Sequence, residues 1–150
     1  MIRVQTEDFD IGSEIKALTE GRTDIGALVT FTGLVRDMNE GRVSLMELEH
    51  YPGMTEKELV RIEQEAHQRW PLQASLIIHR IGRLLPGDNI VLVITASAHR
   101  QAAFEAASFL MDYLKTSAPF WKKEIRDGKA RWVEVRERDN AAMKKWFSQP

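Results

Sequence analysis

The spacing of apolar residues in the first fifty positions predicts a strand, a helix and then two further strands. Weak alternation favours an edge strand over residues 2–5, and apolar residues at helical spacing favour a helix over residues 12–20, ended by a glycine. The β-branched and apolar run 27–35 predicts a buried strand, and the partial alternation of 44–50 predicts a half-buried one. Because the polar loop 36–42 connects them, we expect these two strands to form an antiparallel hairpin.

The middle of the chain predicts a helix followed by two strands. The capping-box pattern at residues 55–58 marks the expected start of the helix, and Pro71 prevents it from continuing. Its predicted buried face consists of four residues at helical spacing: Leu59, Ile62, Ala66 and Trp70. The apolar runs 73–80 and 90–96 predict two strands, separated by a turn at residues 86–89.

The last third of the chain predicts a long helix, a hairpin and a short helix. The long helix covers about residues 100–117, and four residues form its apolar stripe: Phe104, Ala107, Met111 and Leu114. Asp127-Gly128, between the strands expected at 121–126 and 129–135, is a strong hairpin signal, and residues 139–147 predict a helix. These elements together predict an α+β fold with mixed, mainly antiparallel sheets and packed helices.

Composition limits the class of protein. A chain of this length fits one domain over residues 1–150, and its 43% hydrophobic and 29% charged residues are typical of a globular protein. The formal net charge of −1 argues against partners that are nucleic acids or acidic membranes. No apolar run approaches the roughly 20 residues of a membrane span, and the acidic first ten residues lack a signal-peptide core. The chain has no cysteine, which excludes disulfides and fits a cytoplasmic location.

Basic residues gather at the ends of predicted elements. Lys115 lies in the last turn of the long helix, Lys122 lies just past the break at Pro119, and Arg36 ends a strand. Arg100 lies in the first turn of the long helix, where a cation opposes the helix dipole unless an anion binds there. Each residue can also be an ordinary solvated charge, since a lysine in a last helical turn simply complements the dipole. The pattern as a set favours a site for a small anion.

The chain lacks the sequence motifs of metal sites, phosphate-binding loops and serine nucleophiles. His50, His67 and His79 do not show the spacing of metal ligands, and we interpret them as structural or surface residues. The sequence has no glycine-rich phosphate loop and no nucleophile-elbow serine. We therefore expect no metal site and no cofactor.

Seven segments, in order along nearly the whole chain, resemble the large, catalytic subunit of molybdopterin synthase. They are residues 31–36, 48–55, 78–82, 86–88, 97–100, 111–116 and 118–122. The resemblance implies a hammerhead-like single domain and a sulfur-transfer reaction. In that reaction a cyclic pyranopterin monophosphate receives two sulfur atoms and becomes the dithiolene of molybdopterin. The sulfur arrives as the C-terminal thiocarboxylate of a small ubiquitin-like partner subunit.

The resemblance also implies which residues form the site. Arg36, His99 and Arg100 would bind the substrate phosphate and pterin, because guanidinium groups bind phosphate oxygens in fork geometry. Lys115 and Lys122 would bind substrate, stabilise developing negative charge and move protons around the thiocarboxylate and the acyl intermediate. Two adjacent ammonium groups would make one easier to deprotonate. One departure is Ser117, which stands where the family is often basic.

Helix geometry limits how these residues can meet. Arg100 and Lys115 lie fifteen residues apart on one predicted helix, which corresponds to about 22 Å of rise. A small pterin cannot contact both residues from one chain. We therefore expect a homodimer in which the second copy contributes His99 and Arg100 to each pocket. With one small subunit docked at each pocket, the assembly would be a heterotetramer.

Two other interpretations remain open. The chain could be a non-catalytic adaptor that binds the tail of a ubiquitin-like protein, with the lysines acting only as docking charges. An adaptor would tolerate exchange of lysine for arginine, whereas proton transfer or acyl chemistry at an amine would not. A generic anion-binding enzyme would explain the cations but not the density of matching segments.

Overall fold

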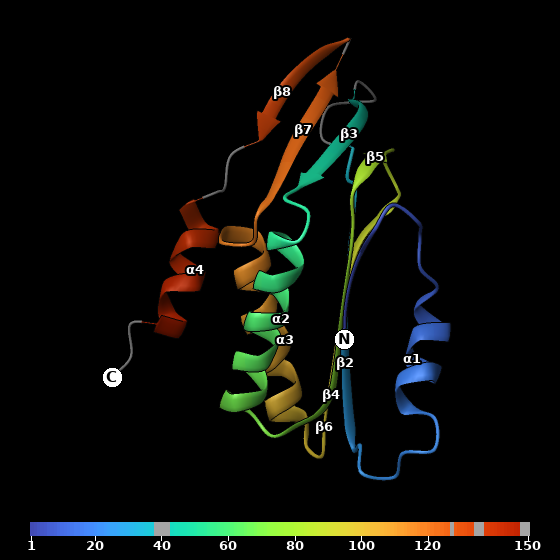
Figure 1. Ribbon diagram of the computed structural model, residues 1–150, viewed down its shortest axis with the longest axis vertical. Helices are drawn as coiled ribbons and strands as arrows, with labels where there is room; N and C mark the ends of the chain where they lie inside the picture. The colour runs from blue at the N-terminus through green and yellow to red at the C-terminus, as the bar shows by residue number, and fades with distance from the viewer. Residues whose placement is uncertain (38–42, 127, 134–136, 148–150) are drawn as a thin grey trace.

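The computed structural model describes residues 1–37, 43–126, 128–133 and 137–147, and it shows two four-stranded sheets with helices packed around them (Figure 1). The first sheet has the order β1 (Ile2–Gln5), β4 (Leu72–Arg80), β6 (Asn89–Ser97) and β2 (Ala27–Leu34). The second sheet has the order β5 (Gly82–Leu84), β3 (Val43–His50), β7 (Phe120–Arg126) and β8 (Lys129–Val133). The helices are α1 (Ile11–Thr19), α2 (Met54–Arg69), α3 (Arg100–Thr116) and α4 (Glu137–Phe147).

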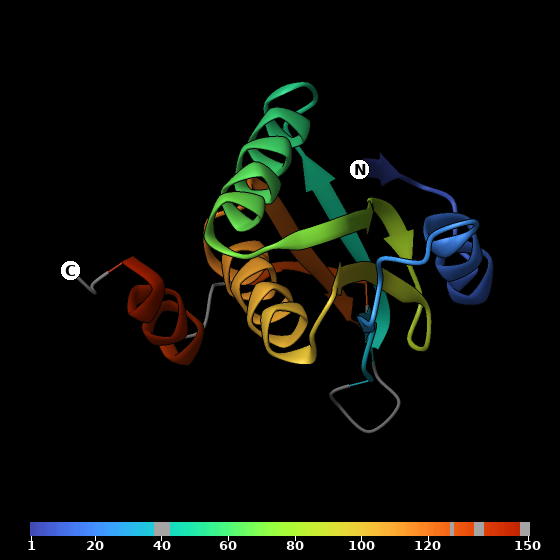
Figure 2. The ribbon, with the colours of Figure 1, turned by 90° about the horizontal axis from the view of Figure 1, so that it is seen from below.

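The first sheet is covered by helices on both faces (Figures 1 and 2). Leu76 and Ile78 of β4 pack in one cluster with residues of α1, whereas Ile77 packs in the other cluster with Leu59 of α2 and Phe109 of α3. A strand buried on both faces reads as a continuous apolar run rather than an alternation. This explains the uninterrupted apolar runs of β4 and β6, and the α+β fold is confirmed.

The strand pairs are antiparallel except that β1 runs parallel to β4. The hairpin expected from β2 and β3 is wrong, because β2 pairs with β6 in the first sheet while β3 pairs with β5 and β7 in the second. A polar connection is equally compatible with a hairpin and with a crossing from one sheet to another. Part of the expected loop, residues 38–42, lies outside the described residues.

Most of the other predicted elements are confirmed with small shifts of their ends. The hairpin expected around Gly128 is formed by β7 and β8, and Gly128 has a φ of 76°, as such a turn requires. Asp127 and the last two positions of the expected strand 129–135 lie outside the described residues. The sequence did not predict β5, because three residues are too few to show a period.

The start of α2 differs from the expected capping box. The Glu56 carboxylate accepts a hydrogen bond from the backbone N–H of Gly53, at 2.6 Å, so the helix begins two residues earlier than expected. Thr55 is fully buried, and its hydroxyl accepts from the Tyr51 N–H at 2.9 Å and donates to the Pro119 carbonyl at 3.0 Å. The threonine therefore connects α2 to the turn between α3 and β7 instead of capping a helix.

The buried face of α3 also differs from the expected stripe. Phe104 is 60% exposed, and the buried residues are mostly small: Ala102, Ala103, Ala106, Ala107, Phe109, Leu110 and Tyr113. The alanines allow α3 to lie close to β6, where the Thr95 hydroxyl donates to the Ala103 carbonyl at 2.6 Å. The buried face of α3 is therefore the one whose small side chains let the helix lie close to β6. The large apolar side chains of the sequence predicted a neighbouring face of the same helix.

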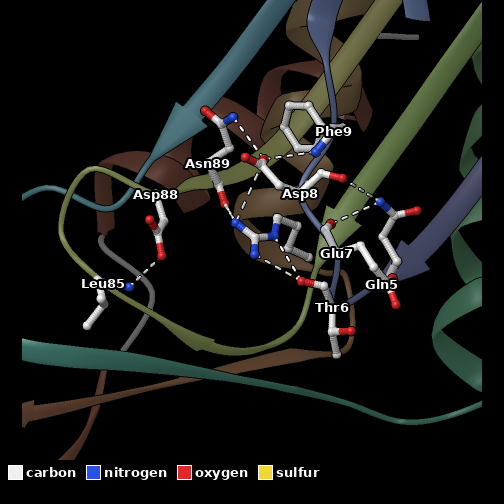
Figure 3. Close-up of polar contacts among 9 residues, drawn as sticks. Gln5, Thr6, Glu7, Asp8, Phe9, Leu85, Asp88 and Asn89 are labelled. Carbon is white, nitrogen blue, oxygen red and sulfur yellow. Dashed lines mark hydrogen bonds and ion pairs between the residues drawn. The ribbon is translucent and has the colours of Figure 1, made fainter.

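Arg80 at the end of β4 connects the N-terminal segment to the turn before β6. Its Nε and Nη2 donate to the Thr6 carbonyl at 3.1 and 3.0 Å, and its Nη1 donates to the Asn89 carbonyl at 3.0 Å. Figure 3 shows the same region, where the Asp8 carboxylate accepts from the Phe9 N–H and from the Asn89 amide. One guanidinium therefore satisfies carbonyl groups from two distant segments.

Replacing Arg80 by alanine is expected to lower the free energy of unfolding by about 2–4 kcal/mol, because charged hydrogen bonds to two carbonyls are lost. The side chain of Arg80 is only 12% exposed, so water replaces these bonds poorly. Urea unfolding followed by circular dichroism measures the change. The control is Arg83→Ala, whose side chain is 79% exposed in its ion pair with Glu47 and is expected to change stability by less than about 1 kcal/mol. Equal effects of the two substitutions would contradict this prediction.

Candidate active site

Lys115 and Lys122 lie on opposite sides of the turn that joins α3 to β7. Lys115 is in the last turn of α3, Ser117 caps the helix, and β7 begins at Phe120. The Thr55 hydroxyl holds the carbonyl of Pro119 in the middle of this turn. The position of one lysine relative to the other is therefore fixed by a buried contact with α2.

The pleat of β7 directs alternate side chains to different faces of the second sheet. Phe120, Lys122 and Glu124 line the same cavity, as expected for residues two apart in a strand. Lys123 does not line this cavity, and its Nζ lies 4.6 Å from the centre of the Trp132 ring. Lys122 and Lys123 are therefore neighbours in sequence with different surroundings.

The cavity has a volume of about 370 Å³, and its lining combines apolar with charged residues. Its apolar lining includes Phe31, Leu34, Met46, Leu48, Ile90, Val91, Met111, Leu114, Phe120 and Val133. Its polar lining includes Arg36, His79, Lys115, Thr116, Lys122, Glu124, Arg138 and Asp139. Small-molecule sites have this size and this mixture of apolar walls with a few placed polar groups. The cavity can hold a ring-shaped ligand that carries an anionic group.

The pKa of Lys122 is lowered from 10.5 to about 8, chiefly by burial and also by the charge of Lys115 and a hydrogen bond with Lys115. Glu124 and Asp139 act in the opposite direction. We expected the neighbouring ammonium group to make one lysine easier to deprotonate; it contributes, but burial is the larger cause. Near neutral pH a fraction of Lys122 is therefore a neutral amine, which can accept a proton.

Replacing Lys122 by methionine is expected to raise the free energy of unfolding by about 1–3 kcal/mol at pH 7, since each pKa unit corresponds to about 1.4 kcal/mol. The pKa of Lys122 is lower in the folded chain than the ordinary 10.5, so the wild-type protein gains stability as the pH rises from about 8 toward 10.5. The advantage of the methionine variant should therefore be complete below pH 8 and disappear across that interval. Urea unfolding at several pH values measures it.

Lys123→Met is the matched control for this prediction. Lys123 sits one residue away on β7, over the Trp132 ring and outside the cavity. Its replacement should change stability by less than about 1 kcal/mol. A gain at pH 7 that is equal for both variants, or one that does not depend on pH, would contradict the assignment of a destabilising charge to Lys122.

Of the five residues that the sequence predicts for the site, three line this cavity: Arg36, Lys115 and Lys122. His99 and Arg100 do not line it, and both are exposed at the other end of α3. Their separation from Lys115 along the helix is about 22 Å. Ser117 is exposed and lies outside the cavity lining as well. The structure of one chain therefore brings together three of the predicted residues and leaves two apart.

His79 is a cavity residue that the sequence analysis missed. It was interpreted as structural or surface, but it is 6% exposed and its ring stacks on Phe120, with centres 3.8 Å apart. It lies two residues beyond Ile77 on β4, so strand alternation puts it on the same buried face. That alternation was the available signal. Arg138 and Asp139 of α4 were also missed, because no local pattern relates α4 to β7.

Among the described residues, no group of three or more His, Asp or Glu side chains is arranged to hold a metal ion. Over the same part of the chain, no helix is long and apolar enough to cross a membrane.

The fold and the cavity together define a class of protein: an α+β protein with a small-molecule site that combines two amines and two guanidinium groups with apolar walls. Comparison with known proteins identifies the family. The family model for the MoaE protein matches residues 4–117. A molybdopterin synthase catalytic subunit from Mesorhizobium japonicum is 61% identical over 149 residues, which cover 98% of this chain and 93% of that protein. The chain therefore belongs to the MoaE family of molybdopterin synthase catalytic subunits.

Solved structures agree with this assignment. The molybdopterin biosynthesis MoaE protein from Burkholderia ambifaria is similar with a TM-score of 0.85 and 52% identity, covering 99% of each chain. The molybdopterin synthase from Staphylococcus aureus is similar with a TM-score of 0.80 and 32% identity, covering 88% of this chain and 96% of that one. The family resemblance stated from the sequence is confirmed.

Proposed function

We propose that this chain is the catalytic subunit of a molybdopterin synthase that transfers two sulfur atoms to cyclic pyranopterin monophosphate. The observation that carries the proposal is the convergence of Arg36, Lys115 and Lys122 on one partly apolar cavity, with the pKa of Lys122 lowered to about 8. The names of the similar proteins support the same reaction. The product is the dithiolene of molybdopterin.

Each cavity residue has a role that follows from its chemistry. Arg36 binds the substrate phosphate, because a guanidinium matches phosphate oxygens with two parallel hydrogen bonds. In each transfer the thiocarboxylate sulfur bonds to a substrate carbon and displaces an oxygen substituent from it. Water then cleaves the bond between that sulfur and the acyl carbon, which leaves the sulfur on the substrate and releases the donor's tail as a carboxylate. Lys122, part of which is neutral near pH 7, accepts and returns protons in these steps. Lys115, beside it, stabilises the negative charge that develops on the acyl group.

The sulfur donor must be another molecule, since the chain has no cysteine of its own. We assign this role to a small ubiquitin-like subunit whose C-terminal thiocarboxylate enters the cavity. We also propose a homodimer in which the second copy places His99 and Arg100 at the cavity, because neither residue lines it within one chain. One small subunit per cavity completes a heterotetramer. We place the reaction in the cytoplasm, a reducing compartment with which a cysteine-free chain is compatible.

A single-turnover assay tests the proposed function. The purified chain is mixed with the thiocarboxylated small subunit and cyclic pyranopterin monophosphate, and the dithiolene product is quantified over time. We expect product to accumulate together with the carboxylate form of the small subunit's tail. A stable complex with the small subunit that yields no product would instead identify the chain as a non-catalytic adaptor. The absence of both complex and product would exclude both functions.

A further inference from the structure

His79 of β4 carries one hydrogen bond that fixes where its proton lies. Its Nδ1 is 2.8 Å from the backbone carbonyl of Arg80. A carbonyl oxygen can only accept a hydrogen bond, so Nδ1 must carry the proton. In the neutral ring the other nitrogen, Nε2, is then an acceptor with a lone pair.

The surroundings of His79 keep the imidazole neutral. The ring is 6% exposed and lies against Phe120 of β7 in a stacked arrangement. The pKa of His79 is lowered to about 4, chiefly by burial; the hydrogen bond to Arg80 opposes this change, and Lys122, Lys115 and His50 contribute to it. The ammonium groups of Lys122 on β7 and Lys115 on α3 therefore act against a second proton on the ring. Near neutral pH, Nε2 is a hydrogen-bond acceptor.

This acceptor has no partner among the described residues, whose hydrogen bonds include only the Nδ1 bond for His79. Two side-chain atoms of the described residues are fully buried and lack a hydrogen-bond partner, Arg3 Nε and Gln73 Oε1, and His79 Nε2 is not one of them. Nε2 therefore remains open to solvent, and the space that the ring lines is the cavity. A free acceptor on a nearly buried ring that lines a cavity is suited to a ligand that donates a hydrogen bond there.

We propose that His79 is a substrate-binding residue whose Nε2 accepts a hydrogen bond from an N–H or O–H group on the substrate's ring system. This inference rests on the proposed function, and it adds a contact to the ring rather than to the anionic group. The arginines and lysines of the cavity can only donate to a substrate when they are charged. The acceptors that remain for a donor on the ring are His79 Nε2, the Thr116 hydroxyl and the carboxylates of Glu124 and Asp139, and of these His79 is the one stacked on an aromatic wall, Phe120. The apolar residues of the cavity lining, such as Phe120 and Met111, suit the faces of a planar heterocycle.

Two substitutions at His79 separate its two nitrogens. Asparagine places an amide N–H near the position of Nδ1 and leaves nothing at the position of Nε2. Glutamine is longer, and its amide oxygen reaches the position of Nε2. We expect His79→Asn to weaken binding of cyclic pyranopterin monophosphate to the assembled enzyme by roughly tenfold, as for loss of one good hydrogen bond, and His79→Gln to recover most of that loss. His67→Asn, on α2 and outside the cavity lining, is the control.

The reverse order, with asparagine close to wild type and glutamine weak, would show that only the bond to the Arg80 carbonyl matters and would overturn the proposal. A pH–rate profile that shifts in His79→Asn while substrate affinity stays constant would also overturn it, because the partner of Nε2 would then be a lysine. Failure of the wild-type enzyme to bind the pterin would remove the proposed function itself and this inference with it.

Nitrogen NMR of the labelled imidazole gives an independent readout in the wild-type protein. We expect a neutral ring protonated at Nδ1, with the Nε2 signal alone moving when cyclic pyranopterin monophosphate is added. A ring protonated at Nε2, or an Nε2 signal that does not move when the ligand is added, would overturn the assignment of His79 as a substrate-binding residue. Neither of these two results would affect the proposed sulfur transfer, which the single-turnover assay measures separately.

Discussion

Replacing Lys115 by alanine is expected to lower the single-turnover rate of dithiolene formation by about 10²- to 10⁴-fold, the range that a positioned acid–base or charge-stabilising group contributes. Lys115 lies at the end of α3 and lines the cavity beside Lys122. Its removal takes away both a positive group and a neighbour that lowers the pKa of Lys122. Rapid quenching followed by quantification of the dithiolene measures the rate.

Lys123→Ala is the control for this large effect, because Lys123 is a nearby lysine on β7 whose amine lies over the Trp132 ring and which does not line the cavity. Its rate should stay within about threefold of wild type, as for a surface substitution away from the site. A rate for Lys115→Ala that equals that of Lys123→Ala would contradict a catalytic role for Lys115. Binding of the small subunit is measured for both variants. If it is unimpaired, a lower single-turnover rate reflects the chemical step rather than weaker assembly.

Arginine at either lysine position distinguishes chemistry from docking. Arginine keeps the positive charge but does not release its proton in proteins, so Lys122→Arg should lose activity even where the small subunit still binds. In wild type the rate should rise with pH up to about 8, where the amine of Lys122 becomes neutral. If Lys115→Arg and Lys122→Arg both keep the wild-type pH–rate profile, the hypothesis that these lysines transfer protons is wrong. That result would favour the interpretation of the chain as a non-catalytic adaptor.

Local pattern predicted the elements of this fold much better than their partners. The runs that became β4 and β6 were recognisable because a strand covered on both faces is apolar throughout. Whether β2 pairs with β6 or with β3 depends on how the two sheets pack in the folded protein. The residues that connect β2 to β3 carry no local signal of that pairing. The buried face of α3 was misjudged for a related reason, since alanines that touch β6 carry little hydrophobic signal of their own.

The site was predictable to the extent that its residues lie at the ends of elements. Lys115 and Lys122 flank one turn, so their proximity follows from sequence distance. Arg36 was a candidate as a basic residue at the end of a strand, and the family resemblance supported it. Glu124 follows Lys122 by two residues on β7, so strand alternation indicates that both face the cavity. His79 reaches the cavity from β4, in the other sheet, and the sequence offers no measure of that proximity. The rise of an α-helix, in contrast, predicted correctly that Arg100 and Lys115 do not meet within one chain.

Mixed dimers made from two inactive variants are expected to recover activity if the site is shared between copies. One copy carries Lys115→Ala and the other carries Arg100→Ala, and two different affinity tags isolate the mixed dimer. In the shared arrangement one cavity combines both substitutions and the other combines an intact Lys115 with an intact Arg100. The mixed dimer should therefore turn over at about half the wild-type rate, whereas each variant alone forms dimers in which both cavities are defective.

The control pairs Lys115→Ala with Lys122→Ala. Both lysines line the cavity of the same chain, so each copy in this mixed dimer has one defective lysine in its own cavity and no recovery is possible. If the pair of Lys115→Ala and Arg100→Ala is as inactive as this control, Arg100 does not act in the cavity of the other copy. Because α3 separates the two residues by about 22 Å, that result would leave Arg100 without a role in binding the pterin, and Arg36 would be the guanidinium that binds its phosphate.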